Sequence, residues 1–128
     1  MSKIEQVTHD PDWQEPYGLS LGIKANGLVF VSGQIGNDET DELVGPDFVS
    51  QARQTFKNIR TVMEAAGGSL SDIVKLTIMV KDISAARKIK PIIDEFFAKP
   101  YPATTLFQVV SLGHTEALLE IEAIAVAR

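Results

Sequence analysis

The sequence predicts an α+β fold in which two helices cover one face of a mixed β-sheet. Three observations support this prediction. Strand and helix patterns alternate in the order β-β-α-β-α-β-β, one segment has clear helical periodicity, and several expected strands are apolar on both sides. The chain has 128 residues, 45% hydrophobic and 23% charged, with no linker or internal repeat. We therefore expect a single domain over residues 1–128.

The first two strands are predicted from a turn signal between them. Residues 17–24 alternate weakly between polar and apolar, and residues 28–32 form a largely apolar run. The Asn26-Gly27 pair that separates the runs is typical of a hairpin, because both residues accept a positive φ angle. Gly33 is expected to end the second strand, and residues 37–46 then form an acidic loop.

The first helix has the clearest pattern in the chain. Asp47 is its predicted N-cap, and Gly67-Gly68 is a strong stop signal. The apolar residues recur at spacings of three and four, which places them on one helical face; they are Val49, Ala52, Phe56, Ile59 and Met63.

The second half of the chain predicts a buried strand over residues 73–80 and a second helix capped by Ser84. Pro91 lies within that helix, where a proline costs about 3 kcal/mol. The helix is therefore expected either to kink at Pro91 or to begin its regular part near Lys90.

Two further strands, over residues 103–110 and 118–127, complete the sheet. Helices on one face leave the other face uncovered, and several strands are apolar on both sides. An isolated chain of this size would expose a large apolar patch. We therefore expect self-association to bury the uncovered face.

The composition argues against several classes of function. The chain has no cysteine, which excludes thiol nucleophiles, disulfides and cysteine-ligated metals. It carries 17 acidic and 12 basic residues without a basic stripe, so no nucleic-acid partner is expected. His9 and His114 lie far apart in the sequence, so neither a metal nor another cofactor is predicted, and His114 is interpreted as a solvated loop residue. Without a signal-peptide pattern or a long apolar run, the chain is expected to be cytoplasmic, with no membrane partner.

Two carboxylates in the last strand stand out as candidates for chemistry. Strand alternation puts Glu120 and Glu122 on one face and their apolar neighbours on the other. One interpretation is a solvated sheet face or ion pairs. The other is a cleft in which one glutamate holds a water or a substrate nitrogen, with a pKa raised by partial burial. Tyr17 at a strand entrance, and Thr104 and Thr105 at the start of another strand, also have ordinary structural explanations.

Seven short segments together resemble the RidA/YjgF family of reactive intermediate deaminases. They are Pro16-Tyr17, Phe30 to Ile35, Ala65-Ala66-Gly67, Ser71 to Lys75, Val80-Lys81-Asp82, Tyr101-Pro102-Ala103 and Leu119 to Ala125. The likeness covers nearly the whole chain with matched spacing. It implies a chorismate-mutase-like subunit that forms a homotrimer, with pockets for small molecules at the subunit interfaces.

The resemblance also implies an activity, the metal-independent hydrolysis of enamines and imines such as 2-aminoacrylate to 2-keto acids and ammonia. In the family an arginine binds the substrate carboxylate, and a glutamate positions water. The glutamate matches Glu120, which is the predicted catalytic residue. Tyr17, Ser32 and Gly33 match residues of the substrate pocket.

One departure from the family pattern bears on function. Where the family has Pro-x-Arg-Ser, this chain has Thr104 in place of the arginine, followed by Thr105. Losing a bidentate contact to a carboxylate costs on the order of 2–5 kcal/mol, a loss of roughly a hundredfold or more in affinity. Both threonines are predicted to bind the substrate, and Lys90 is predicted to supply a substitute charge.

The sequence is compatible with two hypotheses about function. The first is an imine deaminase of altered specificity, which the retained Glu120 and Tyr17 favour. The second is a non-catalytic trimer that binds a small metabolite or a protein partner in the same cleft, which the uncharged Thr104 favours. The ribonuclease activity reported within the family fits poorly with the net charge of −5.

Overall fold

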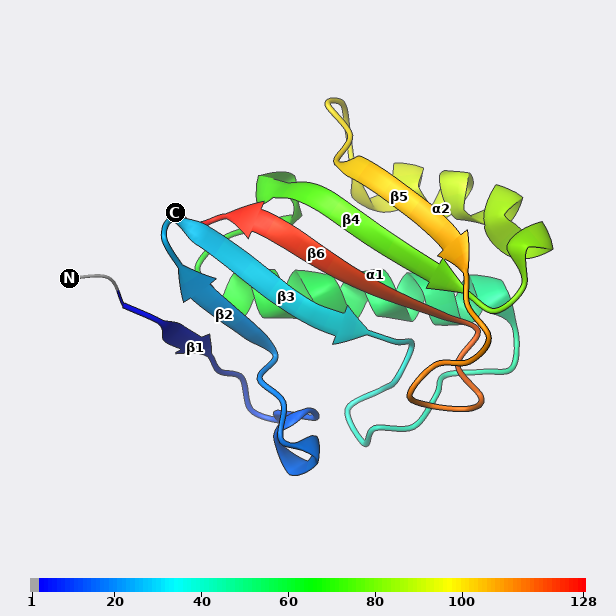
Figure 1. Ribbon diagram of the computed structural model, residues 1–128, viewed down its shortest axis with the longest axis horizontal. Coiled ribbons are helices and arrows are strands. Elements are labelled where there is room, and N and C mark those ends of the chain that lie inside the picture. The colour runs from blue at the N-terminus through cyan, green and yellow to red at the C-terminus, as the bar shows by residue number, and fades with distance from the viewer. Residues whose placement is uncertain (1–2) are drawn as a thin grey trace.

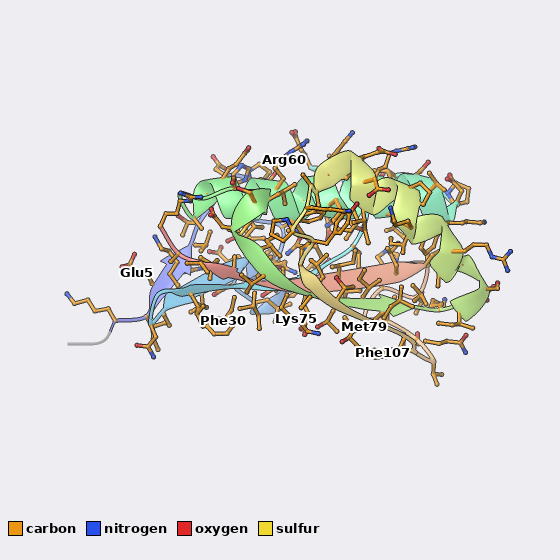
Figure 2. The ribbon with its side chains drawn as sticks, turned by 90° about the horizontal axis from the view of Figure 1, so that it is seen from above. Glu5, Phe30, Arg60, Lys75, Met79 and Phe107 are labelled. Carbon is orange, nitrogen blue, oxygen red and sulfur yellow. The ribbon has the colours of Figure 1, made fainter. Side chains whose placement is uncertain are left out.

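The computed structural model describes residues 3–128 as one six-stranded mixed sheet with both helices on the same face (Figures 1 and 2). This confirms the predicted fold class. The strand order is β1-β2-β3-β6-β4-β5, and only the β4–β5 pair is parallel. The strands are β1 (Glu5–Val7), β2 (Gly22–Ala25), β3 (Leu28–Gln34), β4 (Ile73–Val80), β5 (Ala103–Gln108) and β6 (Leu119–Val126). Within residues 3–128, no helix is long and apolar enough to cross a membrane.

The predicted hairpin between β2 and β3 is confirmed. Asn26 and Gly27 form its turn with φ angles of 52° and 76°. Gly33 does not end β3, however. The strand continues to Gln34, with an irregular register between Val31 and Gln34 where it pairs with β6. The chain thus keeps its strand pairing across Gly33 while its path shifts locally.

The prediction of a strand over residues 17–24 is wrong for its first half. Glu15–Tyr17 form a short 3₁₀ turn, and β2 begins only at Gly22. Pro16 fits the first positions of such a turn, because a backbone N–H there would form no hydrogen bond within the turn. The Asp12 carboxylate accepts the N–H groups of Gln14 and Glu15, both at 3.1 Å, which fixes the start of the turn. Tyr17 therefore lies on a loop and not at a strand entrance.

The first helix, α1 (Phe48–Ala65), follows the predicted pattern. The Asp47 side chain accepts the Ser50 N–H at 2.9 Å, as expected of an N-cap. Phe56 and Ile59 are fully buried between the helix and the sheet. Gly67 follows the helix with a φ of 86°, a conformation that glycine adopts without strain.

The second helix, α2 (Ile89–Phe96), starts where Pro91 allows it. Pro91 is its third residue, where a backbone N–H would have no partner within the helix. The regular part of the helix thus begins next to Lys90, which confirms the second of the two predicted alternatives. Ser84 is not the cap, however. Asp82 caps a preceding 3₁₀ segment, and Ser84 donates both its N–H and its hydroxyl to the Asp82 carboxylate, at 2.9 and 2.7 Å.

The face of the sheet opposite the helices, the outer face, is uncovered and carries several exposed apolar side chains. Phe30, Met79 and Phe107 extend from it on the side away from the helices (Figure 2). Phe30 and Phe107 are 43% and 42% exposed, and Val126 on β6 is 47% exposed. Self-association through this face stays a prediction, because the structure describes a single copy.

Candidate functional site

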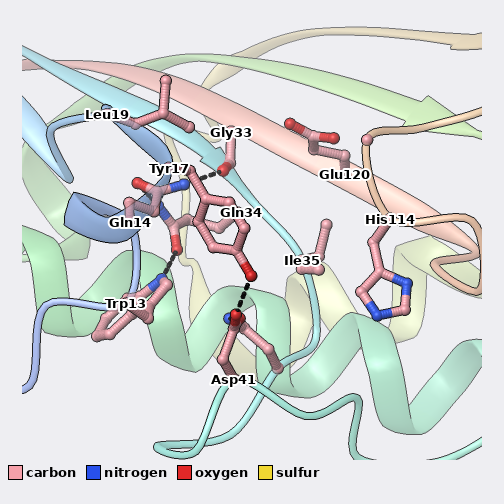
Figure 3. Close-up of a pocket in the computed structure, with 12 residues that line it drawn as sticks. Trp13, Gln14, Tyr17, Leu19, Gly33, Gln34, Ile35, Asp41, His114 and Glu120 are labelled. Carbon is pink, nitrogen blue, oxygen red and sulfur yellow. Dashed lines mark hydrogen bonds between the residues drawn. The ribbon is translucent and has the colours of Figure 1, made fainter.

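A cleft of about 260 Å³ opens at one end of the sheet, where the N-terminal turn, the end of β3, the acidic loop and the start of β6 meet (Figure 3). Its walls come from segments that lie far apart in the sequence. The residues that matter for its chemistry are Trp13, Gln14, Tyr17, Gly33, Gln34, Asp41, His114 and Glu120.

Glu120 is the half-buried carboxylate of this cleft. It faces the outer side of β6, opposite Met79 on β4, while Leu119 and Ile121 are fully buried on the helix side. Burial, and secondly the charge of Glu122, raise its pKa above the ordinary value of 4.5. Within residues 3–128, no hydrogen bond to its oxygens contributes to this shift, so they are free to hold a water molecule or a polar atom of a ligand.

Gly33 lies in close contact with the Glu120 carboxylate and leaves no room for a larger residue. A Cβ atom at position 33 would lie 2.0 Å from Glu120 Oε2, far inside van der Waals contact. The Gly33 carbonyl is fixed as well, because it accepts a hydrogen bond from Gln14 Nε2 at 2.9 Å (Figure 3). The backbone of β3 therefore forms a rigid wall beside the carboxylate.

We expect Gly33→Ala to displace the Glu120 carboxylate, because the new Cβ cannot lie 2.0 Å from Oε2. Gly45→Ala is the control, because the new Cβ would meet nothing closer than 3.4 Å. Crystal structures and circular dichroism of both variants test this. An unmoved Glu120 carboxylate in folded Gly33→Ala would contradict the assigned contact.

Tyr17 contributes a phenol that is anchored by the acidic loop. Its hydroxyl donates to Asp41 Oδ2 at 2.5 Å (Figure 3). Asn37 Nδ2 in turn donates to Asp41 Oδ1 at 2.7 Å. The hydrogen bond and the charge of Asp41 raise the Tyr17 pKa above its ordinary value. The phenol therefore stays neutral, and its oxygen can accept a hydrogen bond from a ligand N–H.

The remaining wall is a network around the buried Gln34 side chain. Trp13 Nε1 donates to Gln34 Oε1 at 3.0 Å, and Gln34 Nε2 donates to the Ser32 carbonyl at 3.1 Å and to Gln14 Oε1 at 3.3 Å. These bonds give both the oxygen and the nitrogen of the Gln34 side-chain amide a partner, and they fix the orientation of Trp13 and Gln14. The network holds the N-terminal turn against β3.

His114 also lines the cleft, although its sequence context suggested only a solvated loop residue. Its side chain is exposed, as predicted, but it faces the cleft across from Tyr17 (Figure 3). Its Nδ1 accepts the Glu116 N–H at 3.1 Å, so the neutral ring carries its proton on Nε2. Nothing in the sequence distinguishes His114, Trp13, Gln14 or Asp41 as cleft residues.

The structure brings Glu120, Tyr17 and Gly33 together, but not the other predicted site residues. Ser32 lies next to the cleft and donates its hydroxyl to the Ser20 carbonyl at 2.5 Å. Thr104 and Thr105 lie on β5, which β4 separates from β6. Lys90 lies on α2 and forms an ion pair with Asp94. In residues 3–128, no three His, Asp or Glu side chains are arranged to hold a metal ion.

Comparisons with known proteins agree with one another. The family described as Endoribonuclease L-PSP matches residues 8–127. A RutC family protein of Pyrococcus horikoshii is 40% identical over 124 residues, which cover 95% of this chain and 98% of that protein. The 2-iminobutanoate/2-iminopropanoate deaminase of Salmonella typhimurium is 36% identical over 133 residues, with both chains fully covered. Among solved structures, the YjgF gene product of E. coli has a TM-score of 0.88 at 30% identity, covering 97% of this chain and 99% of that one.

Proposed function

The chain belongs to the Endoribonuclease L-PSP family, which is the RidA/YjgF family, and we propose that it hydrolyses a small enamine or imine to a carbonyl compound and ammonia. The observation that carries this proposal is the half-buried Glu120 carboxylate, which faces the cleft beside Tyr17 and receives no hydrogen bond from residues 3–128. Relatives named 2-iminobutanoate/2-iminopropanoate deaminase support the same class of reaction.

The chemistry follows from the groups in the cleft. A water molecule donates a hydrogen bond to the Glu120 carboxylate and attacks the imine carbon, while its proton passes to the carboxylate. The carboxyl then returns the proton to nitrogen. The carboxylate next takes the hydroxyl proton of the resulting carbinolamine and passes it to the amino group as the C–N bond breaks, so that ammonia leaves and the carbonyl product forms. The Tyr17 oxygen accepts the N–H of the substrate, which orients the imine toward the water. This route uses no metal and no cofactor.

We propose that three copies bury the outer face and that each cleft is completed by a neighbouring copy. Two features support this assembly: the apolar outer face is exposed in a single copy, and Thr104 and Thr105 lie away from the cleft of their own chain. Sedimentation is expected to give three times the mass of one chain. A stable monomer at micromolar concentration would contradict a shared cleft.

A non-catalytic ligand-binding trimer is the second candidate. It is favoured by Thr104, which stands where the family has its arginine and whose hydroxyl donates to the Pro102 carbonyl at 3.0 Å. A threonine provides one neutral hydrogen bond where an arginine would provide two charged ones.

Turnover of short-lived imines separates the two candidates. Enzymatically generated imines, with and without a carboxylate, are mixed with the protein, and semicarbazide traps the remaining imine. We expect ammonia and the carbonyl product to form faster in proportion to the protein added. If no imine of the panel is hydrolysed faster than in buffer while pyruvate binds, the non-catalytic candidate is the correct one.

The raised pKa of Glu120 predicts a pH dependence. A protonated carboxyl cannot accept the proton of water, so kcat/KM should fall as the pH drops through a value above 4.5. Glu122→Gln removes the second cause of the shift, so the acid limb should move to lower pH. A pH profile of both proteins measures this. An acid limb that moves to higher pH, or does not move, would contradict the assignment to Glu120.

A further inference from the structure

Lys75 lies on the outer face of the sheet, next to the strand that carries the two threonines (Figure 2). On β4 it pairs in register with Ala103, and the next residue, Leu76, pairs with Thr104. Its ammonium group donates to Thr105 Oγ1 at 2.8 Å. The register therefore places Thr104 on the helix side with the fully buried Leu76, whereas Lys75 and Thr105 lie on the outer face, which also carries Glu120.

Lys75 has no acidic partner. The ion pairs of residues 3–128 are Arg53–Glu95, Lys90–Asp94 and Arg128–Asp72. Glu122 extends from the same face of the sheet, two residues before Ile124, the register partner of Lys75, and forms no ion pair with it. Lys75 is already half-buried in a single copy. If a second copy covers the outer face, an unpaired ammonium there becomes costly unless an anion accompanies it.

The cleft has negatively charged residues but no lysine or arginine to bind an anionic ligand. Two of its lining residues, Asp41 and Glu120, are carboxylates, and none of the lining residues is a lysine or arginine. The 2-imino acids that give several relatives their names carry a carboxylate of their own. Such a substrate needs a cation that the cleft of one copy does not provide. Lys90 is a poor source, because Asp94 neutralises it.

We propose that Lys75, held by Thr105, binds the substrate carboxylate in the cleft of the neighbouring copy. This inference rests on the proposed function and on the shared cleft. A lysine is a point charge without the planar fork of arginine, so it attracts a carboxylate but orients it less strictly. The site should therefore accept 2-imino acids of more varied length.

The test compares Lys75→Gln with Lys57→Gln. Lys57 is exposed on α1 in the helix layer, so its replacement makes the same change of charge away from the outer face. With 2-aminoacrylate, we expect Lys75→Gln to raise KM about tenfold or more and to leave kcat within about twofold. Lys57→Gln should change neither. An imine that lacks a carboxylate should be hydrolysed equally well by all three proteins.

Additional variants keep the result interpretable. Lys75→Arg should hold KM within about threefold of wild type, and Thr105→Val should raise it by a few-fold, because the ammonium loses its positioning hydroxyl. Sedimentation checks that each variant assembles as wild type does. An unchanged KM in Lys75→Gln overturns the inference, and a raised KM in Lys90→Gln alone would assign the role to Lys90 instead.

Binding of pyruvate, measured by calorimetry, separates this inference from the proposed function. Pyruvate has the carboxylate of the substrate but needs no turnover. One possible result is that wild type binds pyruvate, that Lys75→Gln binds it about tenfold more weakly, and that neither protein hydrolyses an imine. This result would support the role of Lys75 and contradict the proposed function. If imines are hydrolysed and pyruvate binds both proteins equally, the proposed function is supported and the role of Lys75 is overturned.

Discussion

Glu120→Gln is expected to lower kcat for imine hydrolysis by about 10²–10⁴-fold, the range that a positioned general base contributes. Glutamine keeps the shape of the side chain and still contacts the Gly33 backbone, but it cannot accept the proton of the attacking water. Binding of pyruvate should stay within a few-fold of wild type, because the amide can still hydrogen-bond to the ligand. Steady-state kinetics and calorimetry measure the two effects separately.

Glu122→Gln is the matched control for this variant. Glu122 extends from the same face of β6 but is exposed and lies outside the cleft, so its replacement should leave kcat at the pH optimum nearly unchanged. Loss of stability cannot explain an inactive Glu120→Gln. Because the folded pKa of Glu120 is raised, its carboxylate disfavours the folded state once the pH exceeds that pKa, so the variant should be at least as stable at about pH 7. More than half of wild-type activity in Glu120→Gln would refute the catalytic assignment.

Thr104→Arg is expected to raise kcat/KM for 2-aminoacrylate by about tenfold to a hundredfold. An arginine at this position adds a bidentate, charge-assisted pair to the substrate carboxylate, which a threonine hydroxyl cannot form. Thr104 is exposed at the edge of the sheet, so the longer side chain displaces no core residue. The activity toward an imine without a carboxylate should not change.

The comparison for this gain is Thr61→Arg, which adds the same charge on α1. It should leave the kinetics of both imines as in wild type. If Thr104→Arg folds and assembles but gains nothing toward 2-aminoacrylate, position 104 does not face the cleft of a neighbouring copy.

Local patterns were enough to predict most of the fold. The Asn26-Gly27 turn and the Asp47 cap depend only on neighbouring residues, and both are present as expected. The 3₁₀ turn at Tyr17 cannot be predicted from its own segment, because the hydrogen bonds that favour it come from Asp12, upstream of residues 17–24. The strand β1 has three residues, too few to show a period.

The candidate site was only partly predictable. Alternation in β6 identified Glu120, and the family resemblance added Tyr17 and Gly33. Asp41 and His114 reach the cleft because the acidic loop and the loop before β6 fold toward the same end of the sheet. That meeting is a property of the topology, and no spacing along the sequence encodes it. The Lys75–Thr105 contact likewise exists only because β4 and β5 pair in parallel.

A crystal structure of the protein grown with pyruvate would test the shared cleft most directly. We predict a trimer in which pyruvate contacts Glu120 of one copy, with its carboxylate toward Lys75 and Thr105 of the next. Pyruvate bound elsewhere, or Glu120 open to solvent and remote from every neighbouring copy, would contradict it.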